Sequence, residues 1–212
     1  MANTIKQYKN TIFAGAGLFS VLLTILVLGG IVYLPNFADF ANADATSSVS
    51  VTATISEWLS ISLSTTTANL GTLVDTSGNV SIGSATSDLT LSSNSDNGYS
   101  VTIQGANGGL KNGATSSIAT AASGATSTCT STSPGADAYG AQASSTMTVS
   151  SPFNVTGNTV GSVASTTAQK LVSSVYSASA QTATLTVKAS ANKFDKNGVY
   201  TDTLTLTLTG TP

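Results

Sequence analysis

Apolar and polar residues alternate along most of the chain from residue 48 onwards. Strict alternation puts every second side chain on one face of a strand, so one face meets a core and the other meets water. The polar positions are mostly Thr and Ser, and the β-branched Thr suits a pleated surface. Strands are therefore predicted at residues 48–55, 58–64, 79–82, 88–93, 99–104, 146–150, 183–190 and 200–210.

Clusters of turn-forming residues separate these segments. Short strands at a spacing of roughly 8–12 residues are typical of an antiparallel sandwich, so we expect an all-β, antiparallel, immunoglobulin-like β-sandwich. Residues 166–176 fit this fold as a strand or as a short helical turn, because Leu171 and Val175 lie four apart among poor helix formers. Turns are predicted at residues 75–79, 83–88, 93–98, 105–109 and 191–198.

Two of the predicted strands begin with related motifs. Residues 97–99 read NGY, and residues 197–200 read NGVY. Asn-Gly tolerates the positive φ of a tight turn. Because Val199 shifts the second Tyr relative to its turn, we interpret the motifs as two strand entries in one sandwich, not as one ligand site used twice.

Residues 111–145 interrupt the alternation. They are rich in Ser, Thr, Ala and Gly and contain few large apolar residues. We expect a long insertion with one short strand around Ile118, and such loops are often functional or mobile. The predicted domain organisation is thus an N-terminal segment at residues 1–45 and a single β-sandwich domain at residues 46–212, which carries this insertion.

Residues 1–45 have the pattern of an export segment. Lys6 and Lys9 precede an uncharged apolar stretch at residues 12–34, and small residues follow at 40–48. A cleaved signal peptide accounts for the small residues. A retained transmembrane anchor accounts for an apolar stretch that is long enough to span a bilayer. Both alternatives predict an N-terminal hydrophobic helix in the membrane, with the C-terminal domain outside the cell.

Charge and composition narrow the classes of function. Charged residues make up 8% of the chain, the net charge is −2 and there is no Arg, so nucleic acid is not an expected partner. The lack of His excludes Ser-His-Asp and Cys-His catalysis and zinc sites that need His. Residues 195–198 fail as an EF-hand loop, because Lys193 and Leu204 occupy ligand positions. We expect no enzyme, no cofactor, and no catalytic or metal-binding residues.

Four side chains stand out individually. Trp58 is the one candidate ligand contact: it either stacks on a sugar from the outer face of a sheet or packs under a loop or sheet end. Cys129 is the only cysteine, so it is either an incidental thiol or the site of a disulfide between copies. Asn79 and Asn154 begin N-glycosylation sequons, which matter only in a cell that glycosylates exported proteins.

The last predicted strand carries a family resemblance. The sequence GVYTDTLTLTLT at residues 198–209 resembles the closing strand of spore-coat-U-like pilin subunits and WxL-type surface domains, and NGYSVTIQG at 97–105 adds to the likeness. With the export segment, the whole resembles exported β-sandwich surface proteins of the Saccharibacteria and related candidate phyla. The resemblance implies that residues 198–209 complete an immunoglobulin-like sandwich. Because Ser60 ends the sequence Trp58-Leu59-Ser60, the Trp-x-Leu motif is absent, and no binding residue is carried over.

Three functions from different classes are compatible with these patterns. The first is an exported cell-surface structural or adhesive protein, anchored by its N-terminal helix or released. The second is a pilus or filament subunit in which residues 48–55 fill a neighbour's sheet by donor-strand exchange. The simpler alternative makes this segment the first strand of its own sandwich. The third is a carbohydrate-binding surface module that uses Trp58. The expected partners are therefore the membrane, further copies of the chain, or surface glycans.

Overall fold

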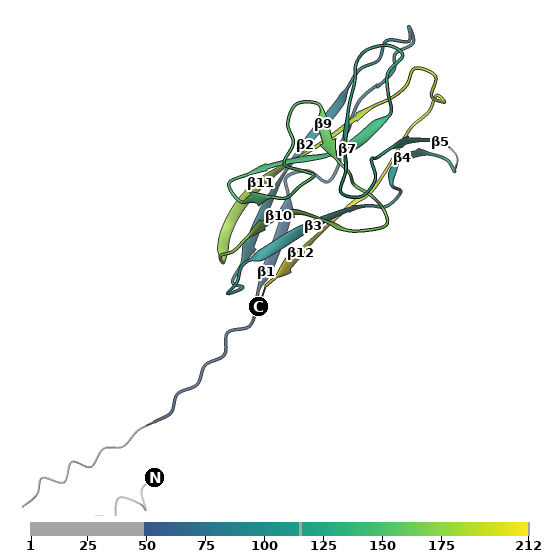
Figure 1. Ribbon diagram of the computed structural model, residues 1–212. Coiled ribbons are helices and arrows are strands. Elements are labelled where there is room, and N and C mark those ends of the chain that lie inside the picture. The colour runs from purple at the N-terminus through teal and green to yellow at the C-terminus, as the bar shows by residue number, and fades with distance from the viewer. Residues whose placement is uncertain (1–48, 115, 212) are drawn as a thin grey trace, which may run out of the picture. The chain divides into compact units, whose positions relative to one another are not determined.

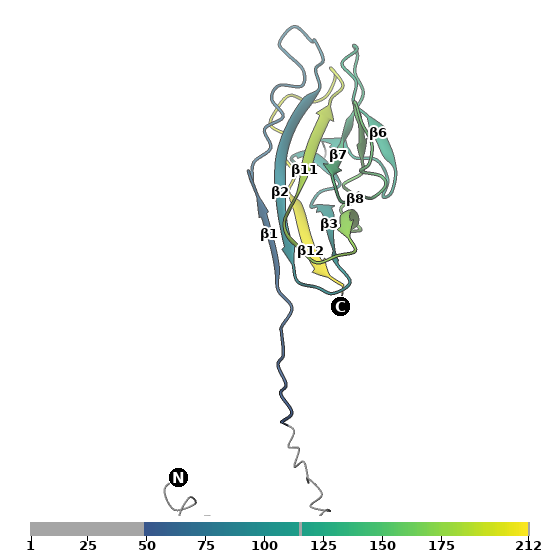
Figure 2. The same cartoon turned by 90° about the vertical axis from the view of Figure 1, so that its left-hand side faces the viewer.

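Six strands form the larger of two antiparallel sheets. In their order across the sheet they are β1 (Leu59–Leu63), β2 (Gly83–Ser93), β11 (Ala178–Ser190), β7 (Ala138–Ser145), β9 (Thr159–Gly161) and β6 (Thr126–Thr128). The structure, a computed structural model, describes residues 49–114 and 116–211. The long strands β2 and β11 run side by side in the sheet, and β1 lies along the outer side of β2 (Figure 2).

Four strands form the second sheet, and a short hairpin stands beside it. The second sheet has the order β12 (Leu204–Gly210), β3 (Tyr99–Gly105), β10 (Gln169–Ser174) and β8 (Thr148–Val149). The hairpin consists of β4 (Gly109–Asn112) and β5 (Ser116–Ala119). β12 pairs with β3 alone, so the last strand of the chain is an edge strand (Figure 1).

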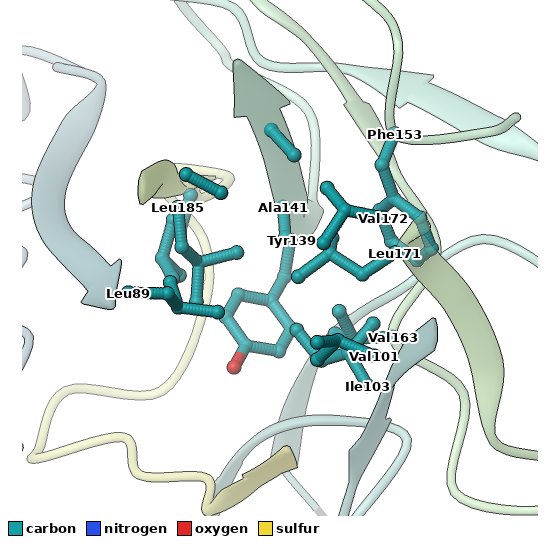
Figure 3. Packing of buried hydrophobic residues seen from close by; sticks show 14 of the residues in the cluster. Leu89, Val101, Ile103, Tyr139, Ala141, Phe153, Val163, Leu171, Val172 and Leu185 are labelled. Atoms are coloured by element: carbon teal, nitrogen blue, oxygen red, sulfur yellow. The ribbon is translucent and has the colours of Figure 1, made fainter. Parts of the chain in front are cut away.

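The core lies between the two sheets. Alternate residues of β2 and β11, such as Leu89 and Leu185, face alternate residues of β3, such as Val101 and Ile103 (Figure 3). The ring of Tyr139 projects from β7 among them. A period of two in the sequence therefore becomes one apolar face on each sheet, and the packed faces provide most of the hydrophobic stabilisation.

The all-β antiparallel prediction is confirmed. The predicted strands at 58–64, 88–93, 99–104, 183–190 and 200–210 each contain or overlap a strand of the structure. The segment at 166–176 holds the strand β10 and no helical turn. The described part of the chain contains no helix long and apolar enough to cross a membrane. The hydrophobic helix predicted within residues 1–45 lies outside the described residues.

Three local predictions were wrong. Residues 79–82 were predicted as a strand, but they belong to none of the strands, and only Val80 forms an isolated bridge, with Val74. Residues 83–88 were predicted as a turn because Ser, Thr and Asp dominate them, but they form the first half of β2 and pair with β11. The long-range partner outweighs the local turn preference. Residues 49–55 were predicted, in the simpler of two alternatives, as a strand of the chain's own sandwich, but in the structure they belong to no strand and their side chains are exposed. They are not the first strand of the chain's own sandwich.

Residues 111–145 contain much more sheet than one short strand near Ile118. The segment includes β5, β6 and β7, and it contributes Ile118, Cys129 and Tyr139 to the buried interior. Its small residues allow neighbouring backbone segments to approach each other closely. A Cβ on Gly140, for example, would lie 2.2 Å from the Gly161 carbonyl oxygen. A segment that is poor in large apolar residues can therefore still be part of the sheet.

The chain divides into two compact units, Met1–Ala53 and Thr54–Pro212. The second unit contains all the strands found among residues 49–114 and 116–211, and both clusters of buried apolar residues found there. It therefore has its own core and all of its own sheet partners, which is what a domain needs to fold alone. In the first unit only residues 49–53 are described, and all five are exposed.

Candidate functional site

A groove opens at the edge of the domain where β1 and β12 diverge. The two strands lie close where β12 ends, because a Cβ on Gly210 would sit 1.7 Å from Glu57 Oε1. At the other end, Leu63 of β1 and Leu204 of β12 line opposite walls of the groove. The space holds about 900 Å³, and the segments 65–75 and 193–203 extend its two walls.

The floor of the groove is the apolar core itself. It is formed by side chains from several elements, among them Leu110, Ile118, Tyr139, Leu185 and Val187. These five side chains are buried, so the groove gives access to the side of the hydrophobic core between the sheets. An apolar floor of this kind suits apolar side chains of a partner better than a charged substrate.

The wall formed by β12 is only partly covered. Leu204, Leu206 and Leu208 are half-buried and pack against the core, whereas the Thr residues between them are exposed. The strand thus shows a leucine face inwards and a threonine face to solvent. β12 is the longest outer-edge strand of the two main sheets, and β6, β8 and β1 are the others.

The charged groups at the rim of the groove are engaged in turns. Asp75 Oδ1 accepts hydrogen bonds from the Ser77 and Asn79 amides at 2.8 Å, and the Asn79 side chain donates to Oδ2 at 2.8 Å. These hydrogen bonds lower the pKa of the Asp75 carboxyl, and those from Asn79 have the largest effect. Its negative charge therefore stabilises its own turn.

Asp195 and Asp137 meet at the end of the groove. Both carboxylates accept the Asn192 amide, at 3.0 Å each. The pKa of the Asp195 carboxyl is raised. Partial burial is the largest cause, and the interaction with the neighbouring Asp137 is the second. The described residues contain no group of three or more side chains able to hold a metal ion. Through the Asn192 amide, the pair joins the loop before β12 to the start of β7.

Asp202 anchors the beginning of β12 from the groove side. Its Oδ1 accepts a hydrogen bond from the Asn107 amide at 3.0 Å and another from the amide of the next residue, Thr203, at 2.8 Å. Oδ2 is buried and accepts no hydrogen bond within the described residues. The Tyr139 hydroxyl lies near this carboxylate, and burial together with the Asp202 charge raises the pKa of that hydroxyl. Tyr139 therefore stays protonated and cannot serve as a base near neutral pH.

The segment before β1 exposes apolar side chains at alternate positions. The exposed fractions are 83% for Val49, 87% for Val51 and 87% for Ile55, and Ala53 is also exposed. Ser50, Thr52 and Thr54 occupy the positions between them. The alternation of apolar and polar residues is visible in the sequence, but it does not indicate that the segment lies outside the sandwich.

Trp58, the single candidate ligand contact from the sequence, is 57% exposed. Its amide donates to Asn94 Oδ1 at 2.6 Å, and Asn94 Nδ2 donates to the Ser56 carbonyl at 2.9 Å. These two bonds hold the residues before β1 to the turn that follows β2. Trp58 is not among the residues that line the groove, so the structure does not bring the predicted contact and the groove together.

Cys129 is buried, with only 1% of its surface exposed. It packs with Ala138 and Val160 in a small apolar cluster, and its Sγ lies 3.9 Å from the Ala138 carbonyl oxygen. Burial raises the pKa of the thiol. A disulfide between copies would require this part of the sandwich to open, so the structure favours the incidental thiol. The sequon residues Asn79 and Asn154 are both exposed.

Comparison with known proteins found no similar protein. No family model matches the chain, and neither a curated protein nor a solved structure matches it. The features available for inferring a function are therefore the groove, the half-covered edge strand β12 and the exposed segment at residues 49–55.

Proposed function

We propose that the protein is an exported structural protein of the cell surface that acts by binding and not by catalysis. The N-terminal sequence pattern supports export, and the domain outside the membrane would be the sandwich, which we assign to the immunoglobulin-like class. The groove supports binding, because its floor is apolar and the acidic groups at its rim, Asp75 and Asp195, are held in turns.

Within this class, we propose a subunit that associates with further copies of itself. The single observation behind this proposal is the segment at residues 49–55, which alternates apolar and polar residues and yet exposes every one of them. Burying a Val or Ile side chain is worth about 1.5–3 kcal/mol. Covering Val49, Val51 and Ile55 would thus favour association by on the order of 5 kcal/mol, before the entropic cost of association is subtracted.

The test is to produce the full chain in a bacterial host that exports it and to recover the protein from the surface or the medium. We expect the domain outside the cytoplasm, and N-terminal sequencing of the recovered protein decides between a cleaved signal and a retained anchor. Light scattering and electron microscopy should show concentration-dependent oligomers or filaments. A variant without residues 46–55 should be monomeric. A full-length protein that stays monomeric at every concentration would contradict the proposal.

A second candidate function is favoured by the exposure of Trp58. An exposed indole on a sheet surface can stack on a sugar ring, and Trp58 is 57% exposed. Glycan-array binding that Trp58→Ala abolishes would support a carbohydrate-binding module. Tyr176→Ala is the matched control, since Tyr176 is an equally accessible aromatic residue, 75% exposed, in the turn between β10 and β11. Failure to bind any glycan would remove this candidate.

A further inference from the structure

We propose that the free edge of β12 is the receiving site for residues 49–55 of a second copy, which would add a strand beside Leu204–Leu208. The inference rests on the self-association proposed above and names the surface that carries it. It commits to a second copy of this chain as the occupant. Three features support it: the direction of the backbone groups of β12, the side-chain pattern that residues 49–55 share with β12, and the hydrogen bonds that tether the residues before β1 to Asn94.

The backbone groups of β12 divide by odd and even residue number. Thr203 accepts the Ala106 amide at 2.8 Å, and Thr211 donates to the Gly98 carbonyl at 2.8 Å, so both bond towards β3. Adjacent residues of a strand direct their N–H and C=O groups to opposite sides. The odd-numbered residues between Thr203 and Thr211 therefore face β3, and the even-numbered residues face the other way.

The open edge consists of Leu204, Leu206 and Leu208, because Gly210, the fourth even-numbered residue, lies against Glu57. Because β12 pairs with β3 alone, their N–H and C=O groups have no strand partner within residues 49–114 and 116–211. Such a row of backbone donors and acceptors is a template for an added strand. The same three residues direct their side chains to the core, so one set of positions provides both the bonding edge and the apolar wall.

The side-chain pattern of residues 49–55 matches this edge. Val49, Val51, Ala53 and Ile55 would lie on the core side beside the leucines, where the groove at the start of β12 leaves room for them. Ser50, Thr52 and Thr54 would then continue the threonine face of β12 into solvent. The open part of the β12 edge runs from Leu204 to Leu208, because Glu57 lies against Gly210, so it would pair with part of the seven-residue segment.

The other free edges fit less well. β6 has 3 residues and β8 has 2, too few to pair with a seven-residue segment. β1 forms the facing wall of the same groove, but it has only 5 residues. β12 offers the longest edge together with three half-buried leucines.

The tether before β1 disfavours insertion of the segment into its own sandwich. Asn94 binds both the Ser56 carbonyl and the Trp58 amide, next to the end of β12. To reach Leu204 in the same chain, residues 49–55 would have to reverse direction at Ile55–Trp58. Ser56 is the one turn-forming residue of that stretch, and its carbonyl is already bound by Asn94. A second copy has no such constraint.

Charge substitutions in the exposed segment test the donor without disturbing the fold of the domain. Val51→Asp would bring a carboxylate to the core side of the added strand, whereas Thr52→Asp would place the same charge on the solvent face. In the full exported chain we expect Val51→Asp to weaken self-association at least about tenfold, because burying an unpaired charge is costly, and Thr52→Asp to change it little. Equal weakening by both variants, or by neither, would overturn the assignment of the donor.

Cross-linking tests the receiving edge. Copies with Thr52→Cys are mixed with copies with Thr205→Cys, Thr207→Cys or Thr209→Cys, all in a Cys129→Ala background and with a different tag on each partner. We expect a mixed disulfide dimer with at least one β12 cysteine and none with Thr128→Cys on β6. Association that persists with no β12 cross-link, or with one at Thr128, would overturn the receiving site while leaving self-association intact. A wild-type chain that never associates would remove both proposals. In a chain that carries both Thr52→Cys and Thr207→Cys, concentration-independent cross-linking within one chain would overturn the second copy as occupant.

Discussion

Single residues show how the two related motifs, NGY at 97–99 and NGVY at 197–200, serve different turns. Tyr99 is buried at the start of β3, and its hydroxyl donates to Gln181 Oε1 at 2.6 Å. Tyr200 is half-buried in the loop before β12, and its hydroxyl donates to the Lys196 carbonyl at 2.7 Å. One tyrosine links the two sheets, and the other closes its own loop, so the motifs have separate structural roles.

Gly98 allows the first of these turns to pack against β10. Its φ is 84°, and a Cβ there would lie 2.0 Å from the Ser174 carbonyl oxygen. We predict that Gly98→Ala destabilises the domain by about 3 kcal/mol, from backbone strain and a backbone clash together. Gly78→Ala is the control, because Gly78 has a φ of 75° and open space around it. It should cost only about 1 kcal/mol. Urea unfolding measures both, and equal losses would contradict the clash.

The carboxyl of Asp195 should make stability depend on pH in an unusual direction. Its pKa is raised in the folded state, by burial first and then by Asp137. A carboxyl whose folded pKa lies above its unfolded value contributes stability at low pH, and this contribution is lost as pH rises through the folded pKa.

We therefore predict that Asp195→Asn, which keeps an acceptor for the Asn192 amide, gains stability relative to wild type as pH rises above about 4. Thermal unfolding of both proteins between pH 3 and pH 7 measures the difference. Asp96→Asn, at an exposed aspartate in the turn between β2 and β3, controls for the loss of one charge. A difference that shrinks with rising pH would contradict the sign.

At the scale of elements, β2 and β12 contribute differently to the core. Leu89 of β2 is fully buried, whereas Leu206 of β12 is half-buried beside the groove. Leu89→Ala should therefore cost about 3 kcal/mol through the cavity it leaves, and Leu206→Ala only about 1 kcal/mol. Urea unfolding of residues Thr54–Pro212, which contain the whole core, compares them. Equal costs would mean that the groove is closed in solution.

The strands that could be predicted from the sequence are those that bury one face. Tyr99, Val101 and Ile103 alternate with polar residues, and β3 follows directly. By contrast, residues 83–88 look like a turn because their pairing partner, β11, lies about 100 residues away. Local preference cannot report a partner so distant in sequence.

The groove, and the position of residues 49–55 outside the sandwich, were harder to predict from the sequence. Alternation of apolar and polar residues indicates that a segment can join a sheet, but it does not indicate which sheet. Val49 and Val51 would alternate with polar residues in the same way in the chain's own sheet and in the sheet of a second copy. The groove arises from the divergence of β1 and β12, which depends on tertiary packing. Leu204 and Leu206 were predicted on one face of a strand, but their partial exposure was not.

At the scale of the whole molecule, the interior contains one reporter group that needs no substitution. Cys129 is the only cysteine of the chain, and it is buried. Burial also raises the pKa of its thiol, so reactive thiolate is scarce even at moderately alkaline pH.

We predict that a thiol reagent labels Cys129 only as fast as the sandwich opens, so labelling should accelerate with urea in parallel with unfolding. Mass spectrometry of the labelled protein measures the rate. The peptide STCTSTS in the same reagent provides the rate for an accessible thiol. Labelling of the native protein at the rate of the peptide would contradict the buried position.

The pairing of β12 with β3 has a consequence for the time course of folding. The smaller sheet joins Tyr99 near the middle of the chain to Gly210 at its end, and the Ser95 hydroxyl donates to a carbonyl 116 positions away, that of Thr211. Domains dominated by such distant pairings fold slowly. β12 is synthesised long after β3. The sandwich can therefore close only after Gly210 has been synthesised, and until then β3 lacks this partner strand.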